Sequence, residues 1–525
     1  MDNSNEINEL SNDDLEVVED EKLDNEENSV FDKSKAKKNI IYSVILKVLI
    51  LVLSLVARRF LIAYGGNDYN GLNSLYTSII GFLAIADLGI GTAITFCMYE
   101  PIANGNISKV RQLYTLFKRV YFILGIAILA IGGVITFFLP YLAKGYEPDS
   151  TMYISYALSL FAVAITYLYS AKLSLINAYK NNYISTAITS FGIFIQYVLQ
   201  IVLLIVTRSF IVYCSCKVVA SLIQVLTFSL YNKYKNVTKF PEKTDLETKQ
   251  AVTKNVKAMF MHKIGDVIFQ TVDSLVISAI IGVVVLGYYS NYLTILTAMN
   301  EIIKLFIVPL TSVIGHMGVK ATNKEKNDYF RFFYAVNFII GIVFYLGYFS
   351  VCSDLVEICF GEGLELEKEL LLVMSITYFI QFMRQSASVF KDSFGLFYKD
   401  RWLALFASIA NACLSILLAF YVGIYGVLIA TIVVDLLLYH IVEPKILFKY
   451  GFEKTPKYYF YMNYFLIAIF ALEAYLFSLI NINIDNVYLH TLVMGLLSIA
   501  VNIIPVSLMM CRREFRNKLF IFLKR

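Results

Sequence analysis

The chain has 525 residues, of which 58% are hydrophobic and 16% are charged, and its formal net charge is +5. Its apolar residues come in long blocks instead of alternating with polar ones, which excludes a soluble globular protein. The positive charge follows from the placement of Lys and Arg between these blocks, so it does not indicate nucleic-acid binding.

Fourteen apolar blocks are long enough to cross a bilayer. A hydrocarbon core of about 30 Å takes about 20 apolar helical residues, and unpaired backbone groups cannot be left in hydrocarbon. The predicted spans are 39–63, 72–99, 119–142, 151–177, 184–206, 210–230, 258–281, 287–314, 329–350, 369–392, 402–420, 423–447, 459–479 and 487–510. We therefore predict an all-α polytopic membrane protein with about fourteen transmembrane helices.

The distribution of basic residues predicts the orientation of these spans. Loops rich in Lys and Arg stay on the cytoplasmic side of a membrane. With the N-terminus inside, the predicted outward loops contain only the basic residues Lys144, Arg208 and Lys368, and the other Lys and Arg between the spans lie in the predicted cytoplasmic loops and tails. We expect a multi-pass protein of the cytoplasmic membrane with both ends in the cytoplasm.

Charged segments divide the chain into regions. Residues 1–38 are acidic and contain no apolar stretch of signal-peptide length, so we expect a disordered cytoplasmic tail. The seven cysteines lack the spacing of a metal site or of a disulfide framework. The remaining predicted regions are a six-helix bundle at 39–231, a basic cytoplasmic linker at 232–257, a second six-helix bundle at 258–448, a helix pair at 459–511 and a basic tail at 512–525.

The two six-helix regions are similar in sequence. When the chain is shifted by 216 positions, residues 71–126 match residues 287–342 at eleven positions, including Gly71 with Gly287 and Ser74 with Ser290. Six spans separate the copies, so both have the same orientation. We predict two pseudo-symmetric bundles related by an axis along the membrane normal, with a substrate path between them.

Polar residues form a stripe on the first span and another on the seventh. Ser43, Lys47, Ser54 and Arg58 stand at offsets 0, 4, 11 and 15, which places them on one helix face. His262, Asp266, Gln270 and Asp273 repeat this pattern on the seventh span, where Lys263 is the counterpart of Lys47.

Buried charges of this kind are costly in a bilayer, so they usually face a cavity or a partner. We predict a hydrated, partly cationic cavity between the halves that binds a phosphate-bearing head group. The candidate anion-binding residues are Lys47, Arg58, Lys263 and Arg384. The candidates for proton or Na⁺ exchange are Asp87, Asp266, Asp273 and Glu301.

Simpler roles are open for several of these residues. Arg58 and Arg59 stand near the outer end of their span and can snorkel to the interface. Glu301 and Lys304 are three residues apart on a helix and can pair with each other. Lys118, Arg119 and Lys391 are expected at the cytoplasmic interface.

The sequence contains no Walker loop and no assignable nucleophile, metal cluster or pair of catalytic carboxylates. We therefore expect a protein that is not an enzyme and that has neither a metal nor a cofactor, apart from a coupling ion.

Three segments in and after the second predicted span resemble a known family. They are Tyr-Asn-Gly-Leu-Asn-Ser-Leu-Tyr at 69–76, Ala-Asp-Leu-Gly-Ile-Gly-Thr-Ala at 86–93 and Tyr-Glu-Pro-Ile-Ala-Asn-Gly at 99–105. The segments are similar to those of the bacterial polysaccharide-repeat-unit flippases, in the superfamily that includes the multidrug and toxin extruders. Helix number, orientation and basic loops extend this resemblance over residues 39–511.

The resemblance implies two six-helix bundles that open alternately inward and outward. The implied substrate is an undecaprenyl-diphosphate-linked oligosaccharide for capsule, O-antigen or exopolysaccharide synthesis, with a polymerase and glycosyltransferases as possible partners. Lys47 and Arg58 match the family's cationic residues by position on the first span, and the last helix pair resembles one proposed to form a groove for the lipid tail. An ion-coupled drug extruder and a membrane polymerase of lipid-linked sugars are the alternatives.

Overall fold

The computed structural model describes residues 33–84, 90–245, 248–250, 252–253, 265, 267–269 and 271–510. The chain forms two compact units, residues 1–50 and residues 51–525. All elements described below belong to the second unit, except the first part of helix α2.

The described part of the chain consists of helices and the loops that connect them, and it contains no strand. In the N-terminal half they are α2 (Lys33–Leu83), α3 (Ile90–Ala103), α4 (Ile107–Ile135), η2 (Thr136–Phe138), α5 (Leu139–Leu142), α6 (Ser150–Ala178), α7 (Asn182–Thr207), α8 (Phe210–Leu230) and α9 (Lys235–Thr238). In the C-terminal half they are η3 (Ile277–Ile281), α11 (Val283–Lys320), α12 (Asn323–Phe360), α13 (Lys368–Ser393), η4 (Leu396–Tyr398), α14 (Leu403–Val422), α15 (Ile424–Val434), η5 (Asp435–Tyr439), α16 (His440–Ile446), η6 (Leu447–Phe452), α17 (Lys457–Ser478) and α18 (Val487–Met510).

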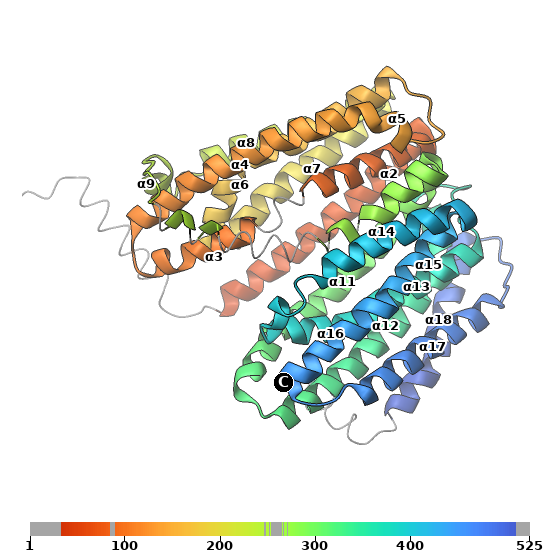
Figure 1. Cartoon of the computed structure of the whole chain (residues 1–525). Coiled ribbons are helices and arrows are strands. Elements are labelled where there is room, and N and C mark those ends of the chain that lie inside the picture. Colours follow the sequence, from red (N-terminus) through yellow and green to blue (C-terminus); the bar gives the residue numbers. More distant parts are fainter. Residues whose placement is uncertain are drawn as a thin grey trace, which may run out of the picture. The chain divides into compact units, whose positions relative to one another are not determined.

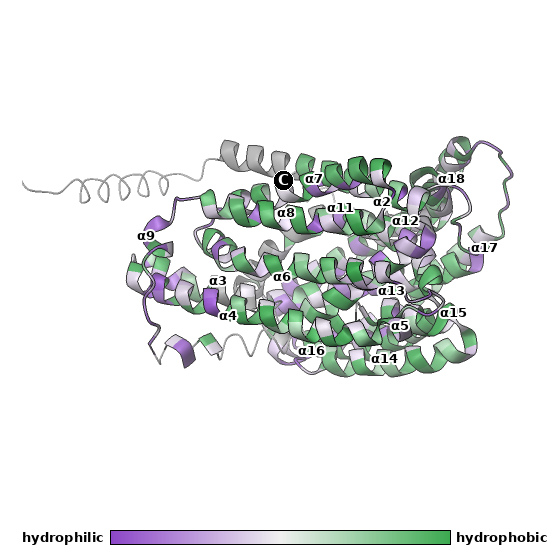
Figure 2. Cartoon of the chain, turned by 90° about the horizontal axis from the view of Figure 1, so that it is seen from above, coloured by the Kyte–Doolittle hydropathy of each residue, from purple (hydrophilic) through white to green (hydrophobic). Residues whose placement is uncertain are grey.

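The predicted polytopic all-α membrane fold is confirmed. Within the described residues, nine helical stretches are long and apolar enough to cross a bilayer, and each coincides with a predicted span. The other predicted spans lie on α2, α3, α11 and α13 and on residues 258–281, which are described only in part. Figure 2 shows the apolar character of the long helices and the hydrophilic character of α9 in the linker.

Helix α2 carries the first predicted span and the beginning of the second. The two parts are separated at Gly66, whose backbone has φ 75° and ψ 176°. Glycine adopts such angles at little cost because it has no Cβ. The second predicted span continues into α3, and residues 85–89 between α2 and α3 lie outside the described residues.

The helices of the N-terminal half pack against one another. Helix α6 contacts α4 on one side and α8 on the other, and α7 packs on α8 (Figure 1). The α4–α6 contact is close at Gly132, where an added Cβ would lie 2.5 Å from the side chain of Leu160. A larger residue at this crossing would therefore require the end of the Leu160 side chain to shift.

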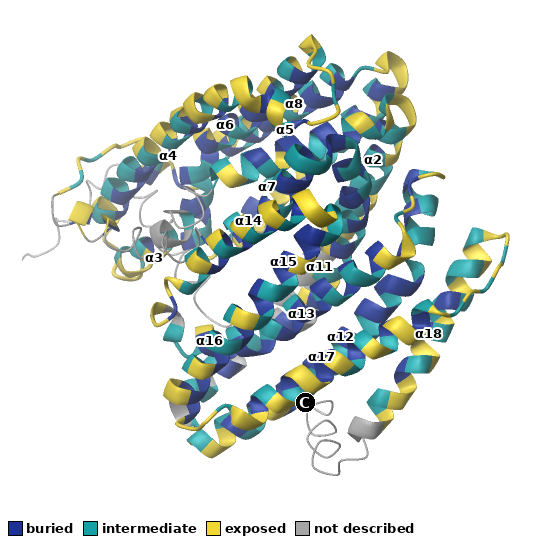
Figure 3. Ribbon diagram, turned by 45° about the vertical axis from the view of Figure 1, so that its right-hand side comes forward, coloured by how far each residue is buried: buried dark blue, intermediate teal, exposed yellow. Residues whose placement is uncertain are grey.

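In the C-terminal half, α12 packs against α13 and α18, and α17 packs on α13. Buried aromatic rings fill this bundle, for example Phe379 and Phe470, which stack with their centroids 3.8 Å apart. Exposed residues run along α17 and α18 (Figure 3), as expected for helices that face lipid.

Candidate functional site

The two halves of the chain meet where α2 crosses α11. Gly71 and Gly287, which are counterparts in the sequence repeat, both lie at this crossing. A Cβ on Gly71 would lie 2.1 Å from the carbonyl oxygen of Val283, and a Cβ on Gly287 would lie 2.7 Å from Asn67. The repeated glycines therefore permit an approach of the two helices that no side chain would allow.

Asparagine side chains form hydrogen bonds between the two helices at this crossing. The Asn67 amide donates to the carbonyl of Val284 at 2.9 Å. The Asn70 amide lies 3.0 Å from both the carbonyl of Gly287 and Oδ1 of Asn291. Asn70 and Asn291 are fully buried, so their hydrogen bonds offset the cost of removing polar groups from water.

Arg58, a predicted anion-binding residue, points into the same crossing. Its Nε donates to Oδ1 of Asn70 at 2.8 Å, and its Nη1 donates to the hydroxyl of Thr294. Its Nη2 donates to Ser74 at 3.1 Å and to Ser290 at 2.5 Å. The guanidinium thus joins both halves of the chain and lies between α2 and α11.

The remaining hydrogen bonds between the halves, as far as the chain is described, lie at the same end of the helices. Val283 donates its backbone N–H to Lys144 at 2.9 Å, Ser278 donates to the carbonyl of Leu142 at 2.6 Å, and Arg59 donates to that of Ile358 at 2.5 Å. These are the ends that the charge distribution predicts to be outside. The halves are joined at this end.

A second cation of the N-terminal half lies near this crossing. Lys217 of α8 donates to Oδ1 of Asn73 at 2.7 Å and lies 3.4 Å from the hydroxyl of Ser159. Within the described residues, no carboxylate pairs with Lys217 or with Arg58. Among the residues that the structure describes, the charges of both cations are therefore uncompensated.

The cations of the C-terminal half are held differently. Arg384 of α13 makes two hydrogen bonds of 3.0 Å to Glu443 of α16, and its guanidinium lies 3.3 Å from the centroid of the Tyr439 ring. Lys391 contacts Glu443 at 3.2 Å and also pairs with Asp400. Two cations and two carboxylates compensate each other here.

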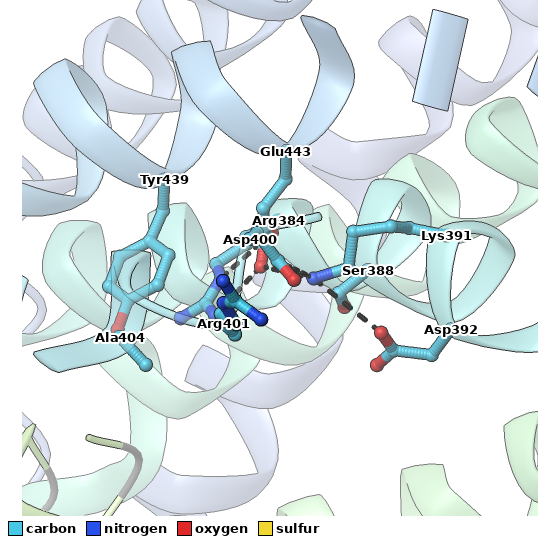
Figure 4. A pocket seen from close by; sticks show the side chains of 9 residues that line it. All are labelled: Arg384, Ser388, Lys391, Asp392, Asp400, Arg401, Ala404, Tyr439 and Glu443. Carbon is cyan, nitrogen blue, oxygen red and sulfur yellow. Dashed lines mark hydrogen bonds and ion pairs between the residues drawn. The ribbon is translucent and has the colours of Figure 1, made fainter. Parts of the chain in front are cut away.

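These charges line a cavity of about 160 Å³ between α13, α14 and the segment 439–443. Figure 4 shows Arg384, Lys391 and Arg401 converging on Glu443 and Asp400. The carboxylate Oδ1 of Asp400 is buried and has no hydrogen-bond partner.

Asp273, a predicted ion-exchange residue, lies inside the C-terminal half. Its carboxylate accepts from the Asn411 amide at 3.1 Å and from the Thr431 hydroxyl at 3.0 Å. Ser415, one helical turn after Asn411, is fully buried and its hydroxyl has no partner. The carboxylate of Asp273 is thus bonded to polar side chains of α14 and α15.

The other predicted site residues are either exposed or outside the described part of the chain. Glu301 pairs with Lys304 at 2.7 Å, and both side chains are more than half exposed. Lys47 is exposed on α2 within the unit of residues 1–50. Asp87, Lys263 and Asp266 lie outside the described residues.

Several residues of the site were not predicted from the sequence. Three of them are uncharged, namely Asn70, Asn411 and Thr431, and Glu443 lies near the end of a predicted span. A search for charged residues inside predicted spans therefore did not select them. Lys217 was not among the predicted anion-binding residues either, although its position as a cation inside a predicted span is a signal that could have found it.

Comparison with known proteins rests on structure, because no protein-family model and no curated protein matches the sequence. A structure described as the lipid II flippase MurJ in an inward closed conformation matches with a TM-score of 0.65 and 14% identity, over 92% of this chain and 100% of that one. An inward-facing multidrug-resistance MATE family transporter of the MOP superfamily matches with a TM-score of 0.63 and 14% identity, over 80% of this chain and 95% of that one.

The chain therefore shares its fold with solved structures described as a MATE family transporter and as a lipid II flippase. An outward-facing MATE structure also matches, with 12% identity over 82% of this chain and 96% of that one, but with a lower TM-score of 0.50. The TM-score is thus higher with the inward-facing structure than with the outward-facing one, and in this chain the described hydrogen bonds between the halves lie at the predicted outer ends.

Proposed function

We propose that this protein is a flippase of the bacterial cytoplasmic membrane that moves undecaprenyl-diphosphate-linked oligosaccharides to the outer leaflet for polysaccharide synthesis. The observation that carries the proposal is the pair of cations, Arg58 and Lys217, whose hydrogen-bond partners are neutral oxygens. A diphosphate is the anion that such a pair suits, because charge-assisted hydrogen bonds to phosphate are strong.

The contrast between the halves favours the N-terminal half as the site of the anion. Arg384 and Lys391 are compensated by Glu443 and Asp400, so an incoming phosphate would compete with carboxylates for them. Arg58 and Lys217 have no such competitor among the described residues. Lys47 and Lys263 stay predicted members of the site.

Alternating access gives Arg58 a second role. While the outer ends are joined, its guanidinium is occupied by Thr294 and Ser290 of the opposite half. Separation of the halves on that side removes both partners and leaves donors for the diphosphate. The same side chain would then hold the gate closed when empty and the head group when the gate opens.

An ion-coupled multidrug extruder is the alternative, and the likeness to a MATE transporter favours it. Two observations favour the flippase. The MurJ structure matches a larger share of the chain, 92% against 80%, and uncompensated cations do not suit a cationic drug. The structures of this fold are described as transporters or a flippase, which supports a function other than catalysis.

Coupling to H⁺ or Na⁺ is proposed to act at Asp273. The partly buried carboxylate of Asp273, bonded to Thr431 and Asn411, and the side-chain oxygens of those two residues are oxygen atoms of the kind that hard cations prefer. Protonation or cation binding would neutralise this acid inside the C-terminal half, and gradient-dependent transfer would follow from that change of charge.

The test is leaflet transfer of a labelled undecaprenyl-diphosphate oligosaccharide by the full-length protein in liposomes. Wild-type transfer that is lost in Arg58→Ala and Lys217→Gln, and retained in Lys304→Gln, would support both the function and the site. Transfer retained in both Arg58→Ala and Lys217→Gln would contradict the proposed site but would still support the flippase function. Absence of transfer by folded protein that exports cationic drugs would replace the flippase by the extruder.

A further inference from the structure

A second cavity, of about 300 Å³, lies between α4 and α6, away from the crossing of the two halves. It is lined by two cations and by apolar or aromatic side chains. The lining residues are Thr115, Lys118, Arg119 and Phe122 of α4 and Tyr167 and Leu168 of α6.

The two cations at this cavity are uncompensated. Lys118 and Arg119 are exposed, and neither makes a hydrogen bond or an ion pair with another residue in the described part of the chain. Arg111, two helical turns earlier on α4, differs because it pairs with Glu242 at 3.2 Å. An anion at the α4–α6 cavity would therefore meet positive charge without a competing carboxylate.

An apolar track leads away from these cations. On α6, Leu168, Phe161 and Ile154 are 53%, 49% and 44% exposed and follow one another at steps of seven residues. On α4, Phe122 and Ile126 are 56% and 53% exposed and are four residues apart. Residues at these spacings share one helix face, so each helix presents a continuous apolar strip.

The cavity lies at one boundary of the membrane. From Ser150, where α6 begins, to Leu168 the helix rises about 27 Å, and from Lys118 to the end of α4 at Ile135 the rise is about 26 Å. Both values approach the hydrocarbon thickness of about 30 Å. The cations therefore stand at the level of the head groups, on the side that the charge distribution predicts to be cytoplasmic, and the apolar strips run from there into the bilayer.

We propose that the α4–α6 cavity is a binding site for an anionic phospholipid of the cytoplasmic leaflet. Lys118 and Arg119 hold the phosphate, and the acyl chains lie along Phe122 and Leu168 and the strips beyond them. Basic cavities between transmembrane helices on the cytoplasmic side suit such head groups. The site does not depend on which substrate the protein transports.

The test is native mass spectrometry of the full-length protein titrated with phosphatidylglycerol or phosphatidylcholine. We expect tighter retention of phosphatidylglycerol by the wild type, and a loss of affinity of about thirty-fold in Lys118→Gln/Arg119→Gln, from the contribution of two cations next to a phosphate. Lys454→Gln/Lys457→Gln removes two exposed cations from another predicted cytoplasmic segment and should leave the affinity unchanged.

A third variant tests the apolar part of the site. Phe122→Asn/Leu168→Asn should weaken retention of phosphatidylglycerol while the preference over phosphatidylcholine persists. Equal retention by wild type and Lys118→Gln/Arg119→Gln would overturn the proposal. So would displacement of the lipid by an equal concentration of glycerol 1-phosphate, which would show recognition of phosphate alone, or displacement by an undecaprenyl-diphosphate sugar, which would assign the cavity to the substrate.

Discussion

Ser74 and Ser290 occupy equivalent positions of the two repeats, and both accept a hydrogen bond from the same nitrogen, Nη2 of Arg58, at 3.1 and 2.5 Å. The repeat therefore supplies matching hydroxyls to one guanidinium at the crossing of α2 and α11. Because the two serines belong to opposite halves, this guanidinium can bond to both of them only while the outer ends of the halves are joined.

Arg58→Lys is expected to loosen the outer ends. Lysine keeps the charge but lacks the planar fork that reaches Asn70, Thr294 and both serines. Loss of charge-assisted hydrogen bonds should raise the population open at the outer ends by at least about tenfold. Distances between spin labels at Tyr141→Cys and Tyr421→Cys, in a background without other accessible cysteines, measure this shift. An unchanged distance distribution would show that Arg58 does not hold the gate.

Gly71→Ala is expected to reduce transport strongly. The added Cβ would lie 2.1 Å from the backbone oxygen of Val283, so the outer ends could not close as they do here. Gly133→Ala is the matched control, because no atom lies within 4 Å of its added Cβ. Leaflet-transfer rates of the two variants give the comparison, and equal rates would mean that closure tolerates a wider crossing.

Asp273→Asn is expected to remove the dependence of transport on an ion gradient. Asparagine can still bond to Asn411 and Thr431, but it cannot exchange a proton or compensate a cation. Transfer with and without imposed H⁺ and Na⁺ gradients measures the effect. Glu301→Gln, whose acid pairs with the neighbouring Lys304, serves as the control and should keep the dependence. A gradient response that persists in Asp273→Asn would show that a residue other than Asp273 couples transport to the ion gradient.

Glu443→Gln is expected to destabilise the protein by about 3–5 kcal/mol, because it removes the carboxylate that pairs with Arg384, whereas Lys391 keeps its ion pair with Asp400. The double variant Arg384→Met/Glu443→Leu should cost less, since it removes opposite charges together. Thermal unfolding in detergent compares them. Transport that persists in the double variant would assign Arg384 a structural role, and its loss from a stable protein would keep Arg384 in the substrate site.

The linker after α8 is predicted to release from α4 only in acid. Glu242 accepts hydrogen bonds from Ser108 and from Arg111, and these contacts hold its pKa below the ordinary value of 4.5. The carboxylate contact is therefore complete above pH 4.5 and is lost as the pH falls through the lowered pKa.

A nitroxide at Lys239→Cys measures this release. Its mobility should be low at pH 7 and rise only below pH 4.5. In Glu242→Gln it should be high throughout. High mobility of the wild-type linker at pH 7 would contradict the docking seen here.

Membrane insertion and fold class followed from the sequence, because a bilayer imposes helix length and apolar composition on each span separately. The repeat paired Gly71 with Gly287, and the structure then showed that both glycines lie at the crossing of the halves, where an added Cβ would meet the opposite helix. Arg58 and Asp273, which the sequence offers as functional charges, both have hydrogen-bond partners in the structure, and their functional roles are still predictions.

Partner identity was decided only by the tertiary structure. In the sequence, Arg384 and Arg58 are both cations inside predicted spans. In the structure, Arg384 bonds to Glu443, which lies 59 positions later in the chain. Arg58 bonds instead to the hydroxyls of Ser290 and Thr294, which lie more than 230 positions later. Helical periodicity fixes which side chains share a face of one helix. Which faces meet depends on how the helices pack, and that packing determines whether a buried cation is compensated or left to bind an anion.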